Sequence, residues 1–158
     1  LSARDLVTAL IMSWILVICV GEKVAAYLGD ISGVFDRFFR DFMLAKLHVA
    51  GVGTKFLNFF DSYLKPRKVV VVVEGVMSDE IEITNQVFQG TVLGPPLWNT
   101  FFSDVTQPTS NIGGDPSLFA DDLSVFQKFD RNTPNAECMR TMEVCRSRIH
   151  KWGRTNRV

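Results

Sequence analysis

The sequence predicts a single α+β domain with a mainly antiparallel sheet. Segments with helical spacing of apolar residues alternate with short β-branched runs, and two pairs of these runs flank turn residues, a pattern typical of hairpins. The chain has 158 residues, of which 47% are hydrophobic and 22% charged. This composition excludes a disordered or low-complexity segment and suffices for one sizeable core.

The charge and cysteine content narrow the function classes. The 17 basic and 17 acidic side chains cancel, which argues against a histone-like or tail-like nucleic-acid binder, because phosphate binding usually leaves a surplus of Lys and Arg. A small basic stripe is still compatible with this balance. The 3 cysteines and 2 histidines lie far from any metal-ligand spacing. We therefore expect no zinc site and no disulfide framework, and an intracellular, reducing location.

The first apolar run, residues 6–20, predicts a buried helix. It is shorter than the roughly 20 residues that a membrane span needs, and Arg4 and Asp5 cancel in front of it, unlike the basic start of a signal peptide. A membrane helix is the alternative for this run. The apolar residues 23–29 that follow predict a central strand, which Asp30 ends.

Two helices are expected next. Apolar residues recur at three- and four-residue steps over residues 35–50, and Gly51 can end that helix. Thr54 can cap a second helix with an apolar face, and Pro66 follows its end. The inward-facing residues of this second helix are predicted to be Phe56, Leu57, Phe60, Tyr63 and Leu64.

The second half of the chain begins with a hairpin, in which residues 69–73 and 81–84 form strands around a turn at 75–79. Pro95 and Pro96 then open a helix. The polar, Gly- and Pro-rich residues 103–116 predict a surface loop.

The last two expected elements are a hairpin and a helix. Residues 117–120 and 123–129 predict the second hairpin, with Asp121 and Asp122 at its tip. Thr133 and Pro134 begin the closing helix. Its apolar stripe consists of Cys138, Met142, Cys145, Ile149 and Trp152.

Three carboxylates fall at the ends of these apolar strands. Asp30, Asp121 and Asp122 would repel one another if brought together, unless a cation neutralised them. Carboxylate oxygens suit Mg²⁺ or Mn²⁺, and two such ions about 4 Å apart support phosphoryl transfer. The alternative is that Asp30 caps the following helix, while Asp121 and Asp122 only form a turn.

The residues around these aspartates form three ordered motifs: residues 30–37 (DISGVFDR), 89–99 (QGTVLGPPLWN) and 119–122 (FADD). In residue identity and order they resemble motifs A, B and C of a reverse transcriptase, specifically the type carried by non-LTR (LINE-like) retrotransposons. Residues 2–6 and 150–156 and the central hairpin extend the resemblance over almost the whole chain.

The resemblance implies a polymerase palm, with residues 1–158 forming a partial reverse transcriptase domain. It assigns Asp30, Asp121 and Asp122 as catalytic residues and as ligands of two Mg²⁺ or Mn²⁺ ions. The implied reaction is attack of a primer 3′-hydroxyl on the α-phosphate of a deoxynucleoside triphosphate. The implied partners are an RNA template and a DNA primer, in the cytoplasm and nucleus and without a membrane.

The same resemblance marks nucleotide-binding residues. Phe35 stands where the family keeps an aromatic ring against the sugar, which would exclude a 2′-hydroxyl; an ordinary core Phe is the alternative. Gln89 and Gly90 match the loop near the template and the incoming nucleotide, and glycine permits close backbone approach. A plain turn before a helix would also use Gly90.

Residues 146–157 form a basic segment that contains no acidic side chain. Arg148, Lys151 and Arg154 are predicted to contact nucleic-acid phosphates. A solvated helix face is the equally open alternative.

We expect this chain to be an incomplete polymerase that does not extend a primer by itself. No basic residue before Asp30 matches the family's triphosphate-gripping residues, and the resemblance stops before the thumb; an inactive retroelement remnant is the alternative. The test is deoxynucleotide incorporation by the purified chain on a primed RNA template. Mg²⁺-dependent incorporation that Asp121→Ala abolishes would contradict this expectation.

Overall fold

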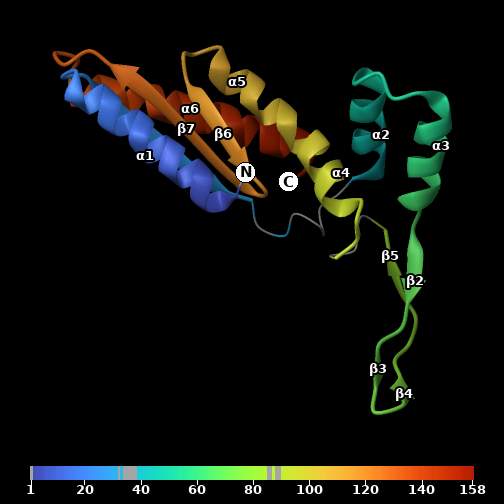
Figure 1. The fold of residues 1–158 in the computed structure, drawn as a ribbon. Coiled ribbons are helices and arrows are strands. Elements are labelled where there is room, and N and C mark those ends of the chain that lie inside the picture. The colour runs from blue at the N-terminus through green and yellow to red at the C-terminus, as the bar shows by residue number, and fades with distance from the viewer. Residues whose placement is uncertain (1, 32, 34–38, 85–86, 88–89) are drawn as a thin grey trace. The chain divides into compact units, whose positions relative to one another are not determined.

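The computed structural model describes residues 2–31, 33, 39–84, 87 and 90–158 (Figure 1). It has mixed α and β structure with antiparallel strand pairing, as the sequence predicts. Contacts divide the chain into two compact units, which are described separately below. The first consists of Leu1–Ser32 with Ser103–Thr155, and the second of Gly33–Phe102 with Asn156–Val158. The assignment of residues 1–158 to one partial palm stays a prediction.

The first unit contains a three-stranded sheet in the order β1-β7-β6. Its strands are β1 (Lys23–Asp30), β6 (Asp115–Phe119) and β7 (Asp122–Phe129). The predicted hairpin around the paired aspartates is thereby confirmed. The predicted central position of residues 23–29 is wrong, because β7 pairs on both sides and leaves β1 at an edge. Four successive β7 residues, 123–126, are buried, as expected for a strand covered on both faces.

Helices α1 (Ala3–Cys19) and α6 (Asn135–Asn156) cover opposite faces of this sheet (Figure 1). On one face the Trp14 ring of α1 meets Phe126 edge-on, with centroids 6.3 Å apart. On the other face lies the predicted apolar stripe of α6, all of whose members are buried. Burial raises the pKa of the Cys145 thiol in that stripe, which keeps it protonated and makes it a packing residue rather than a nucleophile.

The N-terminal run forms the predicted helix, but the expectation that it is buried is wrong. Ser2 and Asp5 close a capping box at its start, and Val17 is its one buried residue. A helix on a single sheet face buries only one stripe, and this run is apolar all round. The large exposed residues of the run are Val7, Ile11, Met12, Ile15, Leu16, Ile18 and Val20.

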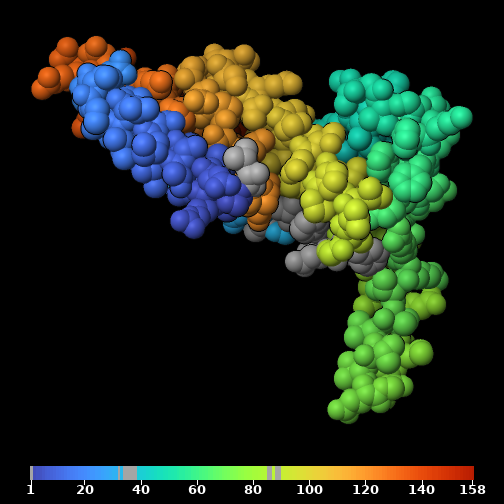
Figure 2. All heavy atoms as spheres, in the orientation of Figure 1, coloured from blue at the N-terminus to red at the C-terminus, as the bar shows by residue number. Residues whose placement is uncertain are grey.

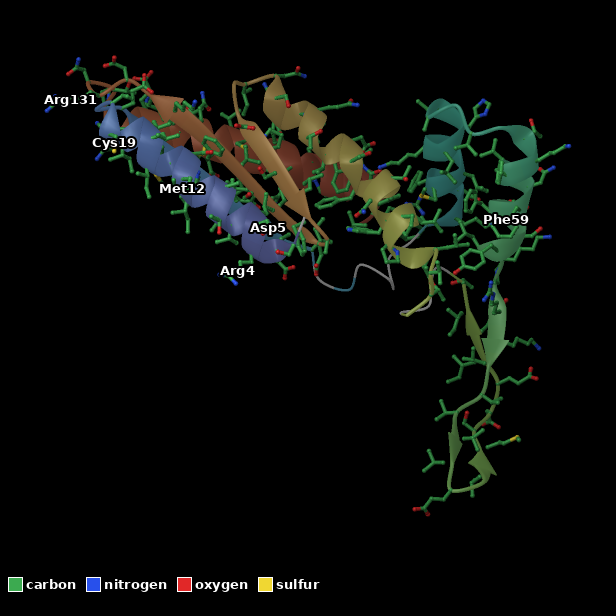
Figure 3. The ribbon with its side chains drawn as sticks, in the orientation of Figure 1. Arg4, Asp5, Met12, Cys19, Phe59 and Arg131 are labelled. Atoms are coloured by element: carbon green, nitrogen blue, oxygen red, sulfur yellow. The ribbon has the colours of Figure 1, made fainter. Side chains whose placement is uncertain are left out.

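The outer side of α1 is open to solvent in the first unit (Figure 2), and Met12 points away from the sheet (Figure 3). No helix in the described part of the chain combines the length and apolar character that crossing a membrane requires.

The prediction of a surface loop at residues 103–116 is wrong as well. This segment forms a 3₁₀ turn (Ser103–Thr106), the short helix α5 (Gln107–Ser110) and the start of β6. Val105 and Thr109 are fully buried, and the indole Nε1 of Trp152 donates to Asp104 Oδ1 at 2.8 Å. Gly114 leaves no room for a side chain, since a Cβ there would lie 2.8 Å from Val125. Gly114 in this segment therefore marks tight packing.

The second unit gathers α2 (Arg40–Val49), α3 (Thr54–Tyr63) and α4 (Gly94–Phe102). Lys46 of α2 reaches α4, where its Nζ donates to the Phe101 carbonyl at 2.6 Å and lies 4.0 Å from the ring centroid. Two predictions for α3 are corrected. Gly53 occupies the N-cap in place of Thr54. Phe56 is 66% exposed, because it lies outside the inward face of this helix. That face consists of the half-buried Leu57, Phe60 and Tyr63, and the buried Leu64 follows it.

A two-part hairpin completes the second unit and confirms the predicted one. The strands β2 (Arg67–Val69) and β5 (Ile81–Ile83) form its base. β3 (Val72–Val73) and β4 (Val76–Met77) extend it away from α3 (Figure 1). The turn is tighter than predicted: Glu74 and Gly75 form it with φ of 50° and 83°, the left-handed pair typical of two-residue hairpin loops.

Truncation of a core ring tests the packing of the second unit. Phe101→Ala should lower the free energy of unfolding by about 3–5 kcal/mol, because the fully buried ring leaves a cavity. Phe56→Ala, at an exposed site in the same unit, is the matched control and should change it by less than about 0.5 kcal/mol. Urea unfolding followed by circular dichroism measures both. Equal losses in the two variants would contradict the described core.

Candidate functional site

The register of β1 and β7 brings the predicted catalytic aspartates to one end of the sheet. Asp30, the last residue of β1, lies directly opposite Asp122, the first residue of β7. Phe119 of β6 also pairs with Asp122, so Ala120 and Asp121 form the two-residue turn between β6 and β7. Residues far apart in the sequence therefore meet through backbone pairing alone.

The turn that carries Asp121 is strained. Ala120 has a φ of 52°, a left-handed conformation that glycine adopts freely and that residues with a Cβ rarely adopt. Such conformations persist where surrounding structure enforces them, and they gather at functional sites. Here the pairing of Phe119 with Asp122 closes the turn tightly, so the backbone position of Asp121 is fixed.

A groove of about 250 Å³ lies beside Asp122 in the first unit. One wall is the start of α1, with Ala3, Leu6, Val7 and Leu10, and the other consists of strand residues that include Ser117 and Ser124. This groove was not among the sites predicted from the sequence. The signal was present, because the four α1 positions follow the i, i+3, i+4, i+7 spacing of one helix face.

The carboxylates are accessible to solvent. Asp30 and Asp122 are exposed and Asp121 is half-buried, and no ion pair to any of the three forms within the described part of the chain. Directly opposite residues of an antiparallel pair have Cβ atoms about 4.5–5.5 Å apart. The like charges of Asp30 and Asp122 are therefore held close together at the sheet end.

The donor set fits a hard divalent cation. Mg²⁺ binds through one or two carboxylates together with substrate phosphates and water, so the opposed pair supplies the protein oxygens that it needs. Within residues 2–31, 33, 39–84, 87 and 90–158, no group of three or more His, Cys, Asp or Glu side chains is arranged around a common metal position. Asp30 and Asp122 are the two carboxylates that the register places opposite each other, and metal binding by this pair with Asp121 stays a prediction.

The predicted nucleotide-binding residues are only partly covered by the structure. Phe35 and Gln89 lie outside the described residues. Gly90 is exposed, with a φ of 85° and open space around its Cα. This backbone conformation requires a glycine at the predicted loop position, and its role in binding a nucleotide stays a prediction.

The predicted basic residues of α6 differ in their surroundings. Arg148 is half-buried, and its Nη1 donates to the Pro108 carbonyl of α5 at 3.1 Å, so it holds two helices of the first unit together. Lys151 and Arg154 are exposed, and their three-residue spacing places them near each other on the helix surface. Their contact with nucleic-acid phosphates stays a prediction.

Comparison with known proteins supports a polymerase relationship. No model of a known protein family matches the chain. Over 98 residues, 61% of its length, the chain is 32% identical to the probable RNA-directed DNA polymerase from transposon X-element of Drosophila melanogaster. The matched stretch spans 11% of the length of that protein. This partial similarity supports a retroelement polymerase-related origin for the chain.

Removal of one charge at the sheet end tests the opposed pair. At low ionic strength and without divalent cations, Asp122→Asn should raise the free energy of unfolding by about 0.2–1 kcal/mol, because like charges directly opposite each other destabilise a sheet. The gain should shrink in 0.5 M NaCl through screening. Asp115→Asn is the control, since Asp115 lies opposite Phe126 at the other end of β6. An equal gain in both variants, measured by thermal unfolding, would refute the pairing.

Proposed function

We propose that this chain is the palm of a retrotransposon RNA-directed DNA polymerase and carries its nucleotidyl-transfer centre. The observation that carries the proposal is the β1–β7 register, which sets Asp30 opposite Asp122 and beside Asp121. Three aspartates from two distant motifs thus meet at one sheet end, in the order that the resemblance requires. The similarity to the transposon X-element polymerase supports the same function class.

In this proposal Asp30, Asp121 and Asp122 would hold two Mg²⁺ or Mn²⁺ ions together with substrate phosphates, since the three side chains by themselves are not arranged around a common metal position. When bound, these ions would stabilise negative charge on the reacting phosphate and favour ionisation of the primer 3′-hydroxyl. The chain itself would position the reacting groups, because in phosphoryl transfer the protein mainly orients charged groups. The paired strands fix Asp30 and Asp122, and the strained Ala120 turn fixes Asp121.

Substrate contacts follow from the remaining predicted residues. Gly90 lets the backbone approach a nucleotide closely, with Gln89 donating or accepting hydrogen bonds and Phe35 selecting a deoxyribose. The exposed Lys151 and Arg154 would contact phosphates of the RNA template or DNA primer. Arg148 would act indirectly, because its guanidinium already binds the Pro108 carbonyl.

The test is Mn²⁺ binding to the purified chain, followed by electron paramagnetic resonance of the free ion. The wild-type chain should bind Mn²⁺, and a deoxynucleoside triphosphate should tighten that binding by adding phosphate ligands. Asp30→Asn and Asp121→Asn should each weaken binding about tenfold or more, because each removes a charged ligand.

The matched control is Asp115→Asn, an exposed carboxylate at the other end of β6, which should bind as the wild type does. If Mn²⁺ does not bind, or if all three variants bind equally, the metal-dependent centre is refuted. That result would favour the alternative, an inactive retroelement remnant that serves as a structural or nucleic-acid-binding domain.

A further inference from the structure

A second binding site lies in the other compact unit, at the start of α2. A pocket of about 350 Å³ is lined by Phe39, Arg40, Asp41, Phe42 and Arg157, among others. Its size falls within the roughly 300–1,000 Å³ typical of small-molecule sites. We infer that this aromatic pocket binds one nucleotide, with the base stacked on its aromatic wall and one phosphate on Arg157.

The wall of the aromatic pocket offers a stacking platform. The Phe39 and Phe42 rings meet edge-to-face with centroids 6.1 Å apart, and both side chains are half-buried. The Arg157 guanidinium lies 5.4 Å from the Phe39 ring centroid and 5.5 Å from that of Phe42. Bases stack on aromatic rings and on guanidinium planes without regard to sequence. The rings and the guanidinium together therefore form a surface suited to a base.

The charges of the aromatic pocket match a single phosphate. Arg40 is neutralised, because it pairs with Asp61 and its Nη1 lies 3.8 Å from Asp41. Arg157 is exposed and forms no ion pair within the described residues. The Arg157 guanidinium, which has no ion pair among the described residues, suits one phosphate, whereas the nearby exposed Asp41 carboxylate disfavours the extra charges of a triphosphate.

One further donor in the lining lacks an acceptor. The Arg40 Nε is buried and has no hydrogen-bond partner among the described residues. A buried donor without a partner is costly, so this group adds a local cost to the folded second unit. The aromatic pocket itself combines a stacking wall with an exposed arginine that forms no ion pair among the described residues.

This inference goes beyond the proposed polymerase function, because the aromatic pocket and the aspartates belong to different compact units. A base with one phosphate is found both as a free nucleotide and as one residue of a single strand. We therefore measure binding of fluorescein-labelled hexadeoxyadenylate by anisotropy, with AMP and ribose 5-phosphate as competitors.

Arg157→Gln and Phe42→Leu should each weaken hexadeoxyadenylate binding about fivefold or more, the loss typical of a removed base-stacking or phosphate contact. Arg131→Gln removes an exposed arginine of the other unit, labelled in Figure 3, and should change binding less than twofold. Displacement by AMP identifies a free nucleotide as sufficient, whereas displacement by oligonucleotides alone identifies a strand. Circular dichroism verifies folding. If Phe42→Leu does not fold, the result for Arg157→Gln, a substitution at an exposed residue, decides the test.

Three results would overturn the inference: no binding, equal losses in Arg157→Gln and Arg131→Gln, or ribose 5-phosphate competing as well as AMP does. The result is separable from the polymerase proposal. Asp121→Asn, which should lose Mn²⁺, should retain hexadeoxyadenylate binding at the aromatic pocket.

Discussion

The antiparallel register of β1 against β7 is the constraint on which the candidate site depends. Side chains alternate between the two faces of a sheet, so a slip of one residue would exchange every inward position for an outward one. Phe126 packs against Trp14 and Val125 is fully buried on the other face, and both contacts hold in one register only. The apolar core therefore determines where Asp30 meets Asp122, although neither aspartate belongs to it.

The end of the sheet that carries the aspartates has two features that lower the stability of the fold. Two like charges face each other across the strands, and Ala120 adopts a conformation that favours glycine. Sequences usually agree with their fold at every level, and local disagreements gather where function requires them. The buried β7 residues and the α6 stripe supply the stability that these local penalties reduce. The buried core of the sheet is thus distinct from the exposed end that carries the aspartates.

The sequence predicts those elements whose signal is local. The hairpin tip at Asp121 and Asp122 is flanked by apolar runs, and the α6 stripe repeats at helical spacing. Burial of residues 6–20 was not predictable, because a run that is apolar all round does not indicate which side packs. Residues 103–116 have the composition of a loop, and their burial depends on α6 contacts distant in sequence. The edge position of β1 likewise depends on long-range pairing, and the aromatic pocket on Arg157, distant in sequence from Phe39.

The valine-rich hairpin of the second unit has a consequence for handling the protein. Val72, Val73, Val76 and Met77 are all more than half exposed, and β3 and β4 pair only with each other in the described structure. Unpaired strand edges with β-branched, uncharged residues are templates for intermolecular β-pairing and amyloid-like aggregation. The ion pair of Lys68 with Glu80 at the hairpin base places charges beside this run, in the position of residues that hinder such growth. Concentrated or heated samples would therefore begin to aggregate along the edges of β3 and β4, between this ion pair at the base and Glu74 in the turn.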